Sequence, residues 1–69
     1  MSSKLIPSTV IEALGRSGAQ EVDELFNKVQ KYQSDLNQID FVRILMTMEL
    51  QGLVRVTKMA KGKKRIELA

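Results

Sequence analysis

The residues with the clearest potential for chemistry are cations near the carboxyl end of the chain. Five of them lie within eight positions with no acid between them: Lys58, Lys61, Lys63, Lys64 and Arg65. Clustered lysine and arginine side chains bind phosphate oxygens and displace condensed counterions, which gives salt-dependent affinity for a polyanion. Lysines on an exposed hairpin also prevent strands from aggregating edge to edge. Both explanations fit the cluster.

The charge of the chain is segregated along its length. The net charge is +3, but residues 1–52 sum to −2 and residues 53–69 sum to +5. A positive field confined to the last quarter of the chain indicates a directed anionic partner. Double-stranded DNA is the partner that we expect first.

Catalytic chemistry is not expected. Histidine and cysteine are both absent, which removes the commonest general base, the commonest metal ligand and any disulfide framework. The acids Glu21, Asp23 and Glu24 fall in one helical turn, where carboxylates usually complement the helix dipole. We therefore expect no enzymatic activity, no metal ion, no cofactor and no small-molecule substrate.

Length and hydropathy limit the organisation to one small domain. The chain has 69 residues, of which 43% are hydrophobic, and this is enough for a single core. No apolar run approaches the roughly 18 residues of a membrane span, and the amino terminus lacks the apolar segment of a secretory signal. We expect a lead-in at residues 1–7, a domain at residues 8–69, and a cytoplasmic protein that is nucleoid-associated if it binds DNA.

Hydrophobic periodicity predicts three helices that would position these side chains. The first follows residue 7 for about two turns, with Thr9 and Glu12 at capping-box spacing. The second begins near Glu21, and the third is capped by Asn37 and stopped by Gly52. One face of the third helix is apolar and is expected to face the core: Phe41, Ile44, Leu45 and Met48.

Two short strands follow the third helix. Leu53–Lys58 alternates apolar and polar residues, Met59–Lys63 has turn composition, and Arg65–Leu68 alternates again. Ile66 and Leu68 are expected to face the core. The predicted fold class is α+β and mostly α, with a three-helix bundle followed by a C-terminal two-stranded β-hairpin.

The outer face of the third helix mixes polar and apolar side chains. Arg43, Thr47 and Gln38 are the residues available there for contacts with DNA bases or phosphates. An apolar stripe that can bind a partner chain, or a second copy, runs along the same face: Ile39, Met46 and Leu50. Packing under the hairpin or the lead-in, a protein interface and base reading all remain open for this face.

The aromatic residues are Phe26, Tyr32 and Phe41. Exposed aromatic rings beside cations can stack on unpaired bases. However, all three residues fall on positions that the helical period turns toward the core. We therefore expect them to pack there, with Tyr32 the one whose polar tip reaches the surface.

The segment Ile44–Val56, ILMTMELQGLVRV, followed by RIEL at Arg65–Leu68, resembles the winged helix-turn-helix superfamily. The resemblance covers nearly the whole chain, and the segment Met48–Val54 matches the pattern Leu-Glu-x-x-Gly-Leu-Val that is common at helix ends in such domains. The segment also resembles the C-terminal winged helix of bacterial DNA-processing proteins and small stand-alone archaeal winged-helix proteins. The resemblance implies that the third helix and the hairpin, or wing, touch a partner, most often DNA. The same fold also serves RNA and protein partners.

Two functional hypotheses follow. The first is a small winged-helix DNA-binding protein of low sequence specificity that binds mainly through its lysine-rich wing. The alternative is a protein–protein interaction module that uses the outer face of the third helix. Such a module would be an accessory subunit of a replication, repair or transcription complex, or a homodimer.

Overall fold

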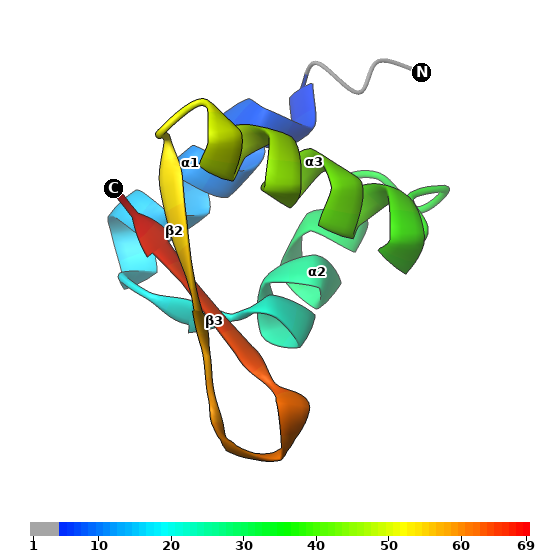
Figure 1. Ribbon diagram of the computed structural model, residues 1–69. Coiled ribbons are helices and arrows are strands. Elements are labelled where there is room, and N and C mark those ends of the chain that lie inside the picture. Colours follow the sequence, from blue (N-terminus) through cyan, green and yellow to red (C-terminus); the bar gives the residue numbers. More distant parts are fainter. Residues whose placement is uncertain (1–4) are drawn as a thin grey trace.

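The computed structural model describes residues 5–69 of the chain. This part forms an α+β fold that is mostly helical, with three helices and a three-stranded antiparallel sheet (Figure 1). The expected fold class is therefore confirmed at this level. In chain order the elements are α1 (Leu5–Ser17), β1 (Gln20–Glu21), α2 (Val22–Gln30), α3 (Gln38–Leu50), β2 (Val54–Lys58) and β3 (Lys64–Leu68).

Helix α1 begins earlier and runs longer than the sequence predicts. It starts at Leu5 and spans 13 residues, so residues 5–7 of the expected lead-in belong to this helix. Pro7 is tolerated because the first four N–H groups of a helix have no intrahelical partner. Ile6 is buried and adds one turn to the apolar face of the helix. The capping box at Thr9 is also wrong, since Thr9 lies inside the helix; residues 1–4 of the expected lead-in lie outside the described residues.

The core forms where the three helices and the inner face of the sheet meet. The rings of Phe26 and Phe41 pack with centroids 5.4 Å apart, which joins α2 to α3. Burial of such side chains is the main source of stability in a domain of this size. The buried apolar residues are Ile6, Val10, Leu14, Val22, Leu25, Val29, Leu36, Phe41, Leu45, Met48, Val54 and Ile66.

Helix α3 has the boundaries that its capping residues predict. The Asn37 side chain accepts a hydrogen bond of 2.8 Å from the backbone N–H of Asp40 at the amino end. At the other end Gly52 has φ +78°, and Leu53 N–H donates to the Met48 carbonyl at 2.9 Å. This pairing, with Gly52 N–H donating to Glu49, is a Schellman motif. Because Gly52 turns the chain sharply, β2 runs directly back from the helix end.

The sheet contains one strand more than expected. β2 and β3 form the predicted hairpin, but Gln20 and Glu21 of β1 pair with Ile66 and Arg65 on the other side of β3. A two-residue strand is too short for any alternation to be recognised in the sequence. β1 fixes β3 to the helices and makes β3 the central strand. The inward prediction for Leu68 is wrong, because this residue lies at the end of the sheet and is exposed.

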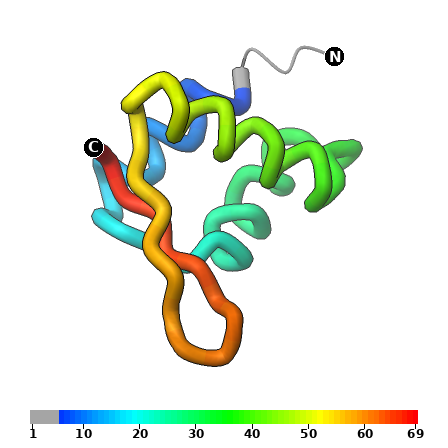
Figure 2. Tube along the Cα trace, viewed as in Figure 1, coloured from blue at the N-terminus to red at the C-terminus, as the bar shows by residue number. Residues whose placement is uncertain are grey.

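The hairpin projects away from the helices. In Figures 1 and 2 the β2–β3 turn forms a loop well below α2 and α3. The molecule is elongated accordingly, with extents of 33 × 23 × 22 Å. The cations of the hairpin turn are therefore carried into solvent, away from the core.

Candidate nucleic-acid interface

The hairpin end, defined as residues 58–65, carries its five cations in solvent. All eight residues are exposed. The chain reverses through the turn Ala60–Gly62, where Gly62 has φ +75° and Lys61 has φ +63°. A lysine in the left-handed region costs roughly 1–2 kcal/mol relative to an ordinary conformation. The turn therefore holds a cation at a position where glycine or asparagine would be less strained.

The strand register places two of these cations opposite each other. Lys58 pairs with Lys64 across the hairpin, whereas Arg55 pairs with Glu67 farther from the turn. Like charges directly opposite on neighbouring strands are destabilising, while opposite charges are stabilising. The electrostatic arrangement is thus favourable near the core and unfavourable at the hairpin end.

A groove separates the hairpin from α3. It has a volume of about 240 Å³, and its floor includes Leu45 and Val56. Lys58 and Lys64 line the hairpin side, and Met46 and Glu49 line the helix side. The opposed lysines therefore point along the face of the sheet that looks toward α3, as strand alternation from Val56 and Ile66 requires.

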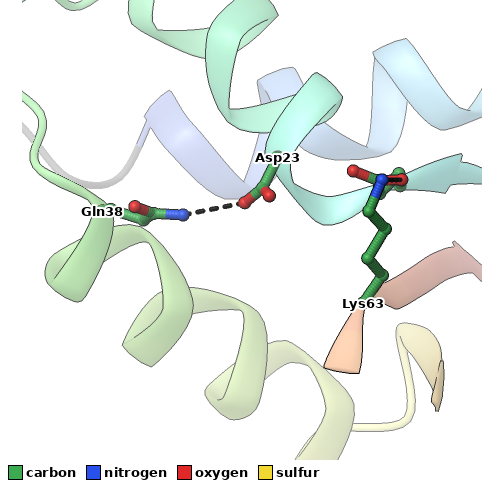
Figure 3. A network of polar contacts seen from close by, with 4 residues as sticks. Asp23, Gln38 and Lys63 are labelled. Carbon is green, nitrogen blue, oxygen red and sulfur yellow. Dashed lines mark hydrogen bonds and ion pairs between the residues drawn. The ribbon is translucent and has the colours of Figure 1, made fainter. Parts of the chain in front are cut away.

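The other cations of the hairpin end point elsewhere. Figure 3 shows Lys63 reaching away from the strand, and its Nζ lies 3.7 Å from a carboxylate oxygen of Glu21. Arg65 lies on the sheet face opposite Lys64 and lines a hollow together with Glu21 and Glu24. The structure therefore brings Lys58 and Lys64 together at the groove and places Arg65 on the opposite face of the sheet.

The polar residues expected on α3 are largely engaged within the chain. Gln38 Nε2 donates to Asp23 Oδ1 at 2.8 Å, as Figure 3 shows. The Thr47 hydroxyl donates to the Arg43 backbone carbonyl at 3.1 Å. Arg43 is exposed. Base readout needs side chains free to donate to and accept from base edges, and Arg43 is the residue of this set best placed to do so.

The apolar stripe on α3 is open to solvent. Ile39, Met46 and Leu50 have 69%, 57% and 89% of their surfaces exposed. The hairpin therefore does not cover the stripe, and residues 1–4 of the lead-in, the other segment expected to cover it, lie outside the described residues. The hairpin turns back from Gly52 past Leu45 and Met46, so Met46 borders the groove, whereas Ile39 and Leu50 do not line it.

Sequence reasoning missed a second cationic surface, the α1–α2 cleft. Tyr32 was expected in the core, but α2 ends at Gln30 and the Tyr32 ring is 81% exposed in the turn that follows. It lines a cleft with Arg16, Lys28 and Lys31. The spacing of Lys28, Lys31 and Tyr32 (i, i+3, i+4) is a signal that these three share a side of the chain. Only the packing of α1 against α2 adds Arg16.

Metal and membrane sites have no support in the described residues. Among residues 5–69, no group of three or more acidic, histidine or cysteine side chains is arranged to hold a metal ion. No helix in this part of the chain is both long and apolar enough to cross a bilayer. Comparison of the chain with protein-family models, with curated proteins and with solved structures finds no match.

Proposed function

We propose that this chain is a winged-helix DNA-binding protein that contacts the duplex backbone mainly through its hairpin, with low sequence specificity. The hairpin end would lie along phosphates, and α3 would face the same duplex across the groove. Arg43, with Gln38 and Thr47 where their internal hydrogen bonds exchange, would supply the few contacts from the helix. The protein would act by binding and not as an enzyme.

The observation that carries the proposal is the pairing of Lys58 with Lys64 at a projecting hairpin end. Two ammonium groups on opposed strands repel each other in the free protein. A phosphate between them would relieve this repulsion and release condensed counterions. The strained cation at Lys61 supports the same interpretation, because backbone strain concentrates where function requires a particular side chain.

Low sequence specificity is supported by the internal hydrogen bonds of the polar side chains on α3. The amide of Gln38 and the hydroxyl of Thr47 each have a partner within the chain. Asp40 and Glu49 lie on the same helix and would repel phosphates. Affinity would therefore come from lysine point charges, which contact every duplex sequence equally well.

The test is the salt dependence of binding to a random-sequence duplex. Simultaneous Lys61→Ala, Lys63→Ala and Lys64→Ala substitutions should reduce the slope of log K against log salt by roughly 2–3 units, since each phosphate contact contributes about 0.9. All three side chains are exposed, so the fold should be retained. Fluorescence anisotropy with a labelled duplex at several salt concentrations gives both slopes.

The chain offers a control of matched charge. The variant Arg16→Ala, Lys28→Ala, Lys31→Ala also removes three cations, but from the α1–α2 cleft. If the duplex contacts only the hairpin, this variant should leave the slope of log K against log salt for duplex binding nearly unchanged. Equal loss of slope in both triple variants would show a response to net charge and would remove the hairpin from the mechanism.

The apolar stripe favours a second candidate, a protein-interaction module. Leu50, Ile39 and Met46 are exposed along the whole length of α3, and apolar surface of this kind commonly marks a protein interface. Met46→Lys separates the candidates, because it adds a cation facing the proposed duplex and places a charge within the stripe. Duplex binding should be retained or strengthened under the first proposal. The second candidate would be supported if neither the parent nor the Met46→Lys variant binds duplex and only the parent self-associates in sedimentation.

A further inference from the structure

The α1–α2 cleft is a concave surface with a cationic wall. It has a volume of about 580 Å³ and lies between one side of α1, from Ser8 to Ser17, and the end of α2 with the turn that follows it. Arg16, Lys28 and Lys31 line it against one carboxylate, Glu12. The cleft wall therefore carries a net positive charge, although residues 1–52, which contain all of its lining, sum to −2.

Lys28 is held in place by a buried side chain. Its Nζ donates to Gln20 Oε1 at 2.7 Å, and Gln20 Nε2 donates to the Ala13 carbonyl at 3.3 Å. Gln20 is only 8% exposed, and its backbone pairs with Ile66 in the sheet. A surface lysine normally loses about 1.5–2 kcal/mol of rotamer entropy when it is immobilised. Part of this cost is already met at Lys28 before any ligand binds.

The other two cations are available to an anion. The Arg16–Glu12 ion pair has a distance of 3.3 Å, and both side chains are mostly exposed. Such a surface pair contributes little, so the guanidinium can exchange its carboxylate partner for a phosphate at small cost. Lys31 takes part in no ion pair within residues 5–69.

The aromatic ring decides which polyanion fits the cleft. Tyr32 is 81% exposed and stands beside these cations. Stacking of a nucleic-acid base on an aromatic ring contributes roughly 1–3 kcal/mol, but only an unpaired base has a free face. A duplex keeps its bases stacked inside and would leave the ring in solvent. The chemistry of the cleft therefore favours a single strand.

We propose that the α1–α2 cleft binds single-stranded nucleic acid, with a base stacked on Tyr32 and adjacent phosphates on Lys28, Lys31 and Arg16. Lys28 also lines a neighbouring hollow together with Glu21, Glu24 and Arg65, and the strand is placed on the Tyr32 side of Lys28, away from these two carboxylates. None of the residues that line the cleft belongs to the hairpin end, so the proposed site does not depend on duplex binding. Tyrosine stacking does not read the 2′-hydroxyl, so oligothymidylate is a sufficient probe.

The fluorescence of Tyr32 provides a direct readout. The chain has one tyrosine and no tryptophan, so its ultraviolet emission comes from this residue. Titration with an oligothymidylate of about 12 nucleotides, within the usual site size, should quench that emission after correction for absorbance. Absence of quenching while the oligonucleotide binds would show that the ring is not in contact and would overturn the proposal.

Variants of exposed residues then test the contacts by anisotropy of a labelled oligothymidylate. Tyr32→Ala should weaken binding roughly tenfold, while Tyr32→Phe should bind as the parent does, because the ring is retained. Lys31→Ala should reduce the salt slope by about 0.7, the value for one phosphate contact on a single strand. Unchanged affinity in Tyr32→Ala would contradict the proposal.

The hairpin triple variant, Lys61→Ala, Lys63→Ala and Lys64→Ala, is the matched control. It should bind oligothymidylate and quench Tyr32 as the parent does, even if it has lost duplex binding. Loss of oligothymidylate binding in this variant would assign the single strand to the hairpin and would overturn the cleft. Failure of duplex binding alone would instead count against the proposed function and leave this result intact.

Discussion

The hairpin end and the α1–α2 cleft are both cationic, but they present their charge in different ways. The hairpin end is convex, carries five cations and has no aromatic ring. The cleft is concave, has three cations against one acid, and includes Tyr32. A convex row of charges suits the outside of a duplex backbone, whereas a hollow with a ring suits an unpaired base.

The two surfaces also differ in what holds their cations. Lys58 and Lys64 face each other across the hairpin, so their arrangement stores repulsion that an anion would relieve. The Lys28 ammonium group instead donates a hydrogen bond to the buried side-chain amide of Gln20, which positions it before any ligand binds. Charge count alone therefore does not describe a binding surface; the support under each charge determines which ligand it favours.

The largest effect is expected where both surfaces depend on the same core. Phe41 is fully buried against Phe26, and Phe41→Ala should cost about 3–5 kcal/mol. A domain of this length has a total stability of roughly 3–10 kcal/mol, so both proposed binding activities should fall together. Urea denaturation followed by circular dichroism measures the loss. Retention of one activity in an unfolded variant would show that this surface does not need the fold.

A charge reversal at Lys58 sharpens the contrast between the surfaces. Lys58→Glu places opposite charges across the hairpin, which should raise the free energy of unfolding by about 0.2–1 kcal/mol. Duplex affinity should nevertheless fall roughly tenfold, because a phosphate contact becomes a repulsion. Oligothymidylate affinity should not change. A parallel loss of stability and duplex affinity would mean that the lysine pair is structural.

Removal of the buried support tests the cleft in the same way. Gln20→Leu replaces the amide with an apolar side chain of similar size and frees Lys28, so oligothymidylate affinity should fall roughly two- to tenfold from the added ordering cost. Duplex affinity should stay constant in the same preparation. A decrease in both affinities would indicate that Gln20 stabilises the sheet as a whole rather than positioning Lys28.

The smallest effect is expected at the ion pair between the hairpin and β1. Glu21→Gln removes the carboxylate 3.7 Å from Lys63 Nζ, at a cost of roughly 1 kcal/mol at most, because the Lys63 side chain is 55% exposed and the contact is long, although the Glu21 side chain is only 20% exposed. The freed ammonium should raise duplex affinity about twofold at low salt, with the difference vanishing as salt is raised. Weaker duplex binding in this variant would mean that the pair orients the hairpin.

Some elements were predictable because their signals are local. Asn37 and Gly52 mark the ends of α3 by chemistry that acts within a few residues, and both caps form as predicted. Alternation likewise predicts β2 and most of β3. The start of α1 was misplaced because Thr9 and Glu12 resemble a cap, while the burial of Ile6, a tertiary effect, extends the helix by a turn.

The candidate sites divide in the same way. The hairpin cations lie within eight positions of the sequence and could be predicted from it, because a tight turn must be exposed wherever it lies. The pairing of Lys58 with Lys64 could not be predicted without the register between β2 and β3. The exposure of the apolar stripe could not be predicted without knowing which side of α3 the hairpin covers. Tyr32 was misassigned because the periodicity continues beyond the point at which α2 actually ends.

The sequence by itself therefore determined the three helices, the hairpin and the segregation of positive charge, since each depends on neighbours along the chain. Only the tertiary structure decided the pairing of β1 with β3, the opposition of Lys58 and Lys64, and the meeting of Arg16 with Lys28 and Tyr32. These relations join residues that are distant in sequence. They form because burial of the common core, and not local propensity, brings the elements together.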